Sequence, residues 1–247
     1  MKRWGIIVSS DVQFGDQKIR NYKHYQLDRI ILLKEEKNIE MVITAGDLTR
    51  HGTDGKTFCG IRKKTEDQLT PLKKEWVEPL QKAGIKTLIT IGNHDKYTGF
   101  PYFYKPVFKY VKEQHNATYY PRFCSEFSGY YTYEYNGILF ISCGIYPKYL
   151  RWIEKRLTKN KPMIIFYHYN TIEGEAFSDW WPKKDKDNFY NLIKDYKNNI
   201  LCLINGHLHS TYDREWRGIR MINGGGSPMI LLNMEDDKIK DVEIIKK

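Results

Sequence analysis

Two histidines one residue apart, His207 and His209, follow the apolar run NILCLING at residues 199–206. Side chains at positions i and i+2 of an extended chain point to the same side, so a strand ending here would present both imidazoles together. Such a pair could supply two ligands of a metal ion. The alternative is that both are polar loop residues that happen to be neighbours. Because two ligands do not complete a metal site, the other ligands must come from elsewhere in the chain.

Four further apolar runs are accompanied by side chains that bind metal ions or move protons. The runs are residues 4–10, 40–46, 85–92 and 161–170. The side chains, in chain order, are Asp11 and Gln13, Asp47, Asn93 with His94 and Asp95, and His168. Ligands bind beyond the carboxyl ends of the strands in open α/β sheets, so we expect these side chains to converge. Each also has a structural alternative when taken singly: Asp47 could cap a turn, and His168 could be a buried, hydrogen-bonded histidine.

The elements that must position these residues alternate along the chain. Stretches with helical spacing lie between the β-rich runs, at residues 20–37, 65–83, 148–159 and 185–197. The dipeptide Asn136-Gly137 between two β-prone runs predicts a hairpin with a type I′ turn, and Pro79 is expected to kink or end the second helix. The sequence shows no internal repeat and no linker. The pattern therefore predicts a single α/β domain over residues 1–247.

Residues 97–129 differ from the rest because they are rich in Tyr, Phe and Pro and have no clean period. We interpret them as an insert, which either forms a loop or lid over the site or packs against the edge of a sheet. Both interpretations stay open at the level of sequence.

Composition restricts the class of protein. With 247 residues, 41% hydrophobic residues and 19 tyrosines, the chain is expected to fold around a sizeable core. No apolar run approaches the length of about 20 residues that spans a bilayer, so we expect a cytoplasmic protein without a membrane partner. Cys143 and Cys202 lie in apolar runs and are expected to be buried thiols. The net charge of +10 favours anionic partners only weakly, because the lysines are scattered.

The ordered series D-x-Q, GD, GNHD, H and GHLH resembles the motif series of the calcineurin-like metallophosphoesterase family, which runs D-x-H, GD, GNH(D/E), H and GHxH. The series extends from Asp11 to His209 and so covers most of the chain. The resemblance implies a four-layer α/β/β/α sandwich of two mixed sheets flanked by helices. It also implies an enzyme, a metal-dependent phosphatase or phosphodiesterase, in which a metal-bridging hydroxide attacks the phosphorus of a phosphomonoester or phosphodiester.

The same resemblance assigns roles to individual residues. One divalent metal ion would be bound by Asp11, Gln13, Asp47 and His209. The other would be bound by Asp47, Asn93, His168 and His207, so that Asp47 bridges the pair. His94 would face the substrate and assist the leaving group. Asp95 would orient or polarise His94, unless it serves as a helix cap or a solvated loop residue.

Gln13 departs from the family pattern, which has histidine at this position. An amide oxygen is a harder and weaker ligand than imidazole, so we expect Mn²⁺ to be favoured, with Fe, Zn and Mg possible. Two alternatives are that Gln13 reaches the metal through a water molecule, or that this site holds no metal in a protein that has lost its chemistry.

The sequence leaves the substrate open. A small phosphate ester is favoured. A nuclease acting on DNA or RNA is the first alternative, supported by basic residues such as those at 62–64, and a non-catalytic interaction protein that retains the fold is the second. His51 and His115 match no motif and are interpreted as surface or substrate-loop residues. Nothing in the sequence indicates the oligomeric state.

Overall fold

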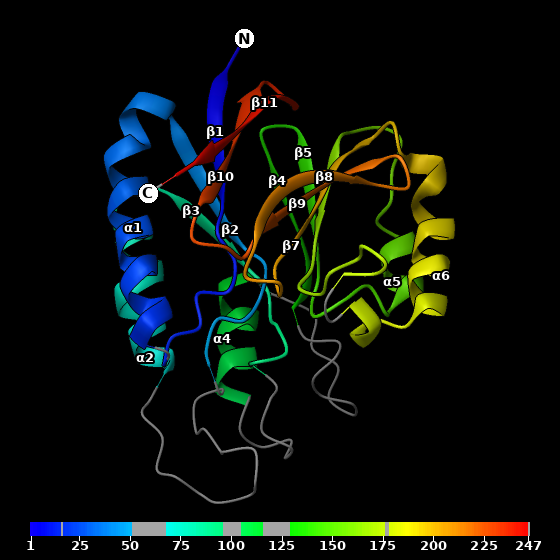
Figure 1. Ribbon diagram of the computed structural model, residues 1–247. Helices are drawn as coiled ribbons and strands as arrows, with labels where there is room; N and C mark the ends of the chain where they lie inside the picture. The colour runs from blue at the N-terminus through cyan, green and yellow to red at the C-terminus, as the bar shows by residue number, and fades with distance from the viewer. Residues whose placement is uncertain (16, 51–67, 96–104, 116–128, 176–177, 247) are drawn as a thin grey trace, which may run out of the picture.

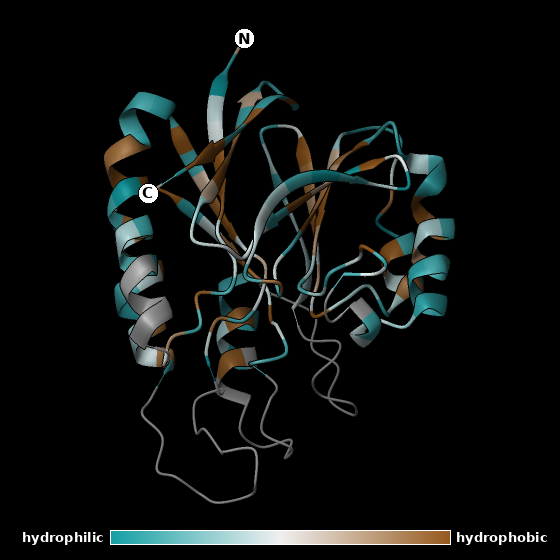
Figure 2. Cartoon of the chain, viewed as in Figure 1, coloured by the Kyte–Doolittle hydropathy of each residue, from teal (hydrophilic) through white to brown (hydrophobic). Residues whose placement is uncertain are grey.

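The computed structural model describes residues 1–15, 17–50, 68–95, 105–115, 129–175 and 178–246. Two β-sheets lie face to face in the middle of the molecule, and helices cover the outer face of each (Figure 1). Figure 2 shows apolar residues concentrated on the strands of the two sheets and hydrophilic residues on the outer helices. The predicted α/β/β/α sandwich of two mixed sheets is therefore confirmed.

The first sheet has the strand order β11-β10-β1-β2-β3. Its strands are β1 (Arg3–Val8), β2 (Ile39–Thr44), β3 (Lys86–Ile89), β10 (Met229–Glu235) and β11 (Lys238–Ile245). Strands β1, β2 and β3 are parallel, whereas β10 is antiparallel to both β1 and β11. Ile6, Ile7 and Val8 are consecutive and fully buried, as expected for a strand covered on both faces.

The second sheet has the order β4-β5-β6-β7-β9-β8. Its strands are β4 (Tyr130–Tyr135), β5 (Ile138–Cys143), β6 (Met163–Phe166), β7 (Ile200–Asn205), β8 (Thr211–Trp216) and β9 (Ile219–Gly224). The four central strands are parallel, and the two edge strands, β4 and β8, are antiparallel to their neighbours. The parallel strands of both sheets deliver their carboxyl ends to the same end of the molecule, at the bottom in Figure 1.

Helices α1 (Gln17–Lys37), α2 (Leu69–Leu72) and α3 (Glu78–Lys82) cover the first sheet, and α5 (Leu150–Glu154) and α6 (Lys183–Ile193) cover the second. The short helices η2 (Ser178–Trp180) and η3 (Lys194–Tyr196) flank α6. None of the helices in the described ranges combines the length and the hydropathy that a bilayer span requires.

Two local predictions have different outcomes. The hairpin is confirmed: Asn136 and Gly137 have φ of 47° and 79°, as a type I′ turn requires. The expected end at Pro79 is wrong, because the helical segment continues through α3 to Lys82. A π-helical turn, η1 (Lys73–Val77), precedes the proline and widens the helix where the proline cannot donate a backbone hydrogen bond.

Cys143 and Cys202 are buried free thiols, as predicted.

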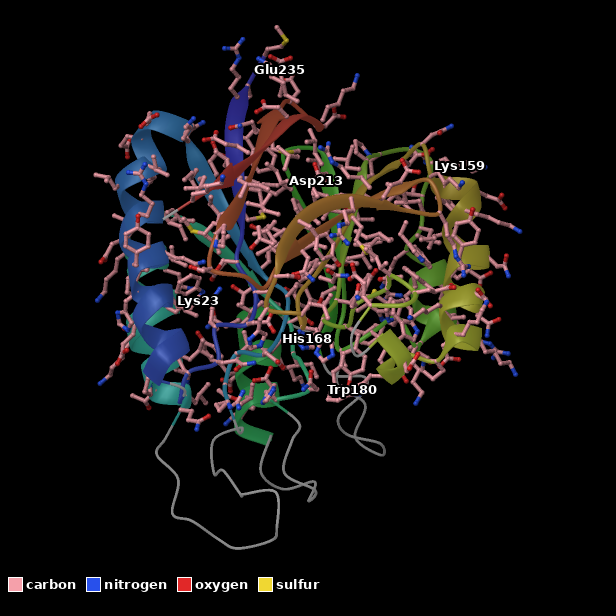
Figure 3. The ribbon with its side chains drawn as sticks, viewed as in Figure 1. Lys23, Lys159, His168, Trp180, Asp213 and Glu235 are labelled. Carbon is pink, nitrogen blue, oxygen red and sulfur yellow. The ribbon has the colours of Figure 1, made fainter. Side chains whose placement is uncertain are left out.

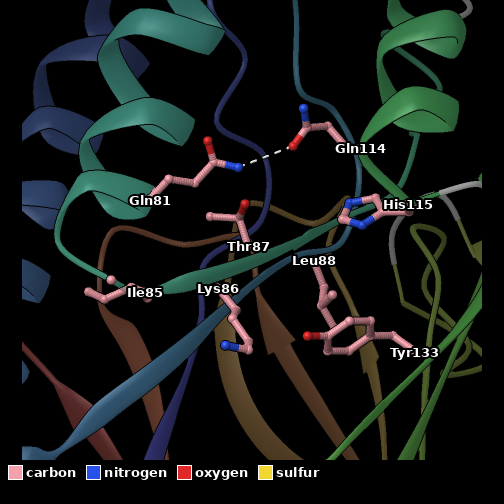
Figure 4. A pocket seen from close by; sticks show the side chains of 9 residues that line it. Gln81, Ile85, Lys86, Thr87, Leu88, Gln114, His115 and Tyr133 are labelled. Atoms are coloured by element: carbon pink, nitrogen blue, oxygen red, sulfur yellow. Dashed lines mark hydrogen bonds between the residues drawn. The ribbon is translucent and has the colours of Figure 1, made fainter.

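Part of the aromatic insert forms helix α4 (Lys105–His115), which packs beside strand β3 (Figure 4). Val107 and Val111 are fully buried. His115 was expected to be a surface or substrate-loop residue, and this expectation is wrong. Its Nε2 accepts the backbone N–H of Ile89 at 3.2 Å, and its ring stacks on Tyr131. This described part packs against a sheet edge. Residues 97–104 and 116–128 lie outside the described residues, as do His51 and residues 62–64, so the lid stays a prediction.

Candidate metal centre

The predicted metal ligands meet where the carboxyl ends of the two sheets come together. Two groups of side chains each bring one ligand atom per residue within 4.8 Å of the others. The groups are Asp47 with His168 and His207, and Asp11 with Asp47 and His209. Asp47 is shared by both groups, which is the geometry that a carboxylate bridging two cations requires. Which residue binds which metal remains the prediction that the resemblance made.

The surroundings of His168 are those of a cation site. Its Nδ1 donates to the carbonyl oxygen of Ala45 at 2.9 Å, so its Nε2 faces the site. Nε2 lies 2.9 Å from Asn93 Oδ1 and 3.2 Å from Asp47 Oδ1, and both of these oxygens are acceptors. Positive charge is therefore needed between them, from a proton or from a metal ion. Imidazole, carboxylate and amide oxygen together suit a divalent transition metal.

The pKa values of the centre follow from its burial and its paired charges. Burial acts to lower the pKa of His168, but the charge and hydrogen bond of Asp47, together with Asp11 and the Ala45 carbonyl, outweigh it and raise this pKa to about 9. Burial would raise the pKa of Asp47, yet the charge and hydrogen bond of His168 hold it well below its usual range. Burial, reinforced by the charge of His168, lowers the pKa of His207 to about 3. His207 is therefore neutral and keeps a lone pair for a metal ion.

Gln13 lies inside the cluster but presents its amide nitrogen. Nε2 lies 3.2 Å from Asp47 Oδ2 and 3.0 Å from His209 Nε2. Oε1 accepts a hydrogen bond of 3.0 Å from Arg50 Nη1. Binding a metal through Oε1 would require the amide to turn over and to lose this contact with Arg50. Direct ligation by Gln13 remains a prediction, and no motif in the sequence had marked Arg50.

His94 and Asp95 are both held against backbone. The Nδ1 of His94 donates to the carbonyl oxygen of Arg50 at 2.9 Å, and its backbone N–H donates to Asp47 Oδ1 at 2.8 Å. The Asp95 carboxylate accepts hydrogen bonds from the backbone N–H groups of Leu48, Thr49 and Gly92. Asp95 thus ties together the loops after β2 and β3. Its predicted action on the His94 ring has no counterpart among these contacts.

The backbone around the ligands is both strained and closely packed. Five of the predicted ligands have left-handed backbone conformations that side chains other than Gly seldom adopt: Asp11, Gln13, Asp47, His207 and His209. A Cβ atom at Gly92 would lie 2.2 Å from Asp47 Oδ1, and one at Gly206 would lie 2.4 Å from Asp11 Oδ2. Each acidic ligand therefore needs a glycine beside it. Strain of this kind concentrates at functional sites, where the surrounding structure maintains it.

Lys23 is a second residue that sequence reasoning missed. It projects from α1 toward the loop after β1 (Figure 3) and is fully buried. Its Nζ donates to the carbonyl oxygen of Ser10 at 2.6 Å and to Ser9 Oγ at 3.1 Å. Burial lowers its pKa to about 7, against the opposing charge of Asp11, while burial raises the pKa of Asp11 to about 7. A lysine in a helix of many lysines gave no signal of this position.

Comparison with known proteins agrees with the site. The model of the calcineurin-like phosphoesterase family matches residues 5–211. No curated protein sequence matches significantly. Among solved structures, a dimetal phosphatase from Danio rerio has a TM-score of 0.67 at 13% identity, with 98% of each chain covered.

Two further solved structures share the fold at similarly low sequence identity. A Thermus thermophilus protein has a TM-score of 0.57 at 13% identity, with 98% of each chain covered. The phosphopantetheinyl hydrolase of Mycobacterium tuberculosis has a TM-score of 0.53 at 11% identity, covering 91% of this chain and 90% of that one. At such identities these likenesses concern the fold alone. The family match spans most of the chain, and the protein belongs to the calcineurin-like phosphoesterases, metal-dependent hydrolases with dinuclear metal centres.

Proposed function

We propose that the protein hydrolyses a small phosphomonoester or phosphodiester with the help of two divalent metal ions, of which Mn²⁺ is favoured. The observation that carries this proposal is the pair of ligand groups that share Asp47 at the carboxyl ends of the strands. Ions at these positions would be held by the seven predicted ligands. When bound, they would supply positive charge for the phosphate oxygens and lower the pKa of an attacking water.

His94 is positioned to handle the proton of the leaving group. Since Nδ1 is engaged by the Arg50 carbonyl, Nε2 is the ring atom that faces the centre, 3.9 Å from Asp47 Oδ2. In the imidazolium form this atom carries a proton that it can donate to the departing oxygen. General acid catalysis of this kind typically contributes about 10²–10⁴ in rate.

Asp95 is a positioning residue in this proposal. Its buried carboxyl holds the loop that carries Asp47 against the loop that carries Asn93 and His94. Burial, followed by the charge of Asp47, raises its pKa to about 6. It acts on the distance between the two loops and makes no contact with the substrate.

The test compares two esters in the presence of Mn²⁺. p-Nitrophenyl phosphate has a leaving group that departs without protonation, whereas the alkoxide of benzyl phosphate needs a proton. We expect His94→Asn to lower kcat for benzyl phosphate by about 10²–10⁴ and kcat for p-nitrophenyl phosphate much less, with metal content unchanged. His24→Asn, a change of a half-exposed histidine on α1, is the matched control.

The other outcomes are distinct. Equal losses for both esters would show that His94 is not the proton donor. Turnover of bis-p-nitrophenyl phosphate alone would identify a diesterase, and degradation of single-stranded DNA that falls steeply with salt would identify a nuclease. A protein that binds Mn²⁺ and turns over none of these substrates would be the non-catalytic relative.

A further inference from the structure

An aromatic wall, formed by Trp180 and Tyr169, borders one side of the metal centre. The ring centre of Trp180 lies 5.1 Å from that of His207, and the ring centre of Tyr169 lies 4.9 Å from it. His207 belongs to the ligand group that also contains Asp47 and His168. Figure 3 shows Trp180 and His168 at the same end of the molecule. Trp180 is thus separated from a candidate metal position by a single imidazole ring.

The exposure of Trp180 is not a consequence of poor packing in this segment. Trp180 is 42% exposed, whereas its neighbour Trp181 is 1% exposed. Trp181 packs against Tyr167 and Phe189 between the second sheet and α6, with ring centres 5.4 and 5.7 Å away. This anchor fixes the backbone and directs the preceding residue outward. A large indole surface is therefore held in contact with solvent beside the centre.

Tyr169 is supported from behind. Its ring stacks on Tyr146 with centres 5.7 Å apart and an interplanar angle of 8°, and Tyr146 in turn contacts Trp181. A wall backed in this way is pre-organised, so a ligand that stacks on it does not need to order the side chains first.

The two sides of the centre differ in chemistry. Arg50 places a guanidinium beside Gln13, next to the ligand group of Asp11 and His209. The wall lies beside His207, in the other ligand group. A substrate that spans Asp47 would therefore meet positive charge on one side and aromatic faces on the other. Phosphate suits the first environment, and a planar ring suits the second.

We propose that Trp180 and Tyr169 form a subsite for the planar aromatic part of the substrate, a nucleobase or a group of similar shape. The proposal rests on the proposed function, because it names the substrate class of the same centre. Stacking of a base on an aromatic side chain is sequence-tolerant, so the subsite distinguishes ring from no ring more strongly than one base from another.

The test uses two ligands that share the phosphate and the ester oxygen. Adenosine 5′-monophosphate and ribose 5-phosphate differ in the presence of the base. We expect calorimetry with the Mn²⁺-loaded protein to show roughly tenfold tighter binding of the nucleotide. Trp180→Leu should bring the ratio of the two affinities close to one, and Trp180→Phe should keep most of it. Tyr25→Leu, at a residue of α1 that is 38% exposed, should leave the ratio unchanged.

A second measurement needs no variant: the nucleotide should quench tryptophan fluorescence more than ribose 5-phosphate at equal saturation. Equal affinities for the two ligands in the unaltered protein would overturn the subsite, as would an unchanged ratio in folded Trp180→Leu. These results are separable from the test of hydrolysis. Turnover without preference for a ring refutes only the subsite, and preference for a ring without turnover of any ester refutes only the proposed function.

Discussion

At the scale of single residues, a buried carboxyl group, Asp11, and a buried amine, Lys23, interact electrostatically at the loop after β1. Asp11 and Lys23 are both fully buried, and each shifts the pKa of the other against the effect of burial. In the metal-free protein, the charge of Lys23 favours the Asp11 carboxylate, as do the larger effect of His168 and the backbone N–H of His207. A bound cation would supply the same charge from the other side.

Replacing Lys23 by Met should therefore destabilise the metal-free protein more than the metal-loaded one. The variant leaves the buried Ser10 carbonyl oxygen without its Lys23 donor and removes a charge that favours the Asp11 carboxylate, so we expect the metal-free variant to lose about 1–3 kcal/mol of unfolding free energy. Mn²⁺ should restore part of this loss. Urea unfolding with and without Mn²⁺ measures both effects. Lys34→Met, at a partly exposed lysine of the same helix, is the control, and equal stabilisation by Mn²⁺ in both variants would refute this interpretation.

At the scale of elements, the loops after β2 and β3 approach each other most closely at Gly92, beside the hydrogen bonds that Asp95 makes between them. A methyl group at Gly92 would lie 2.2 Å from Asp47 Oδ1 and 2.3 Å from the Asp47 backbone nitrogen. We expect Gly92→Ala to displace the shared carboxylate and to lower metal content at least tenfold, with a loss of about 1–3 kcal/mol in stability from overpacking. Metal analysis after gel filtration, together with urea unfolding, checks both numbers.

Gly84→Ala separates displacement of Asp47 from general destabilisation. Gly84 has φ of +74°, and a Cβ atom there would meet nothing within 4 Å. Its substitution should cost about 1–2 kcal/mol through backbone strain alone and should leave metal content unchanged. If both variants lose metal equally, the close approach at Gly92 does not position Asp47.

The docking of α4 on the edge of the first sheet predicts a pH dependence. His115 accepts the Ile89 N–H in its neutral form, and burial lowers its pKa to about 4. In the unfolded chain, His115 has the ordinary histidine pKa of about 6.5 and binds a proton below that pH, whereas the folded protein binds it only near pH 4. The stability that is present above pH 6.5 is therefore lost as the pH falls toward 4. The loss attributable to His115 should approach roughly 3 kcal/mol near pH 4.

Urea unfolding at pH 7 and pH 4.5 checks this value. His115→Gln should be less stable at pH 7 and should show a smaller difference between the two pH values. His24→Gln, at a half-exposed histidine of α1, should keep the difference of the unaltered protein. An unchanged pH dependence in His115→Gln would show that other groups cause it.

At the scale of the whole molecule, the parts of the fold that could be predicted are those that a local sequence pattern determines. The five apolar runs became β1, β2, β3, β6 and β7, because strands buried on both faces are written as continuous apolar segments. The position of β10 could not be predicted. It pairs with β1 through contacts such as Arg3 with Glu235, and no local pattern encodes a pairing over that distance in sequence.

The same division applies to the site. The candidate ligands could be named from the sequence because ordered motifs mark them, and the structure brings these side chains together; that they bind metal ions stays a prediction. Three further residues of the site could not be predicted from the sequence, because tertiary contacts alone determine their positions. They are Arg50, Lys23 and Trp180. Arg50 reaches Gln13 from another loop, Lys23 is buried against the loop after β1, and Trp180 faces outward because Trp181 is anchored.

The most direct test of the shared Asp47 carboxylate is anomalous X-ray scattering from crystals grown with Mn²⁺. We expect two anomalous peaks about 3.5–4 Å apart, one on each side of Asp47, with His168 and His207 beside one and Asp11 and His209 beside the other. A single peak, or ions bound away from Asp47, would contradict the dinuclear centre.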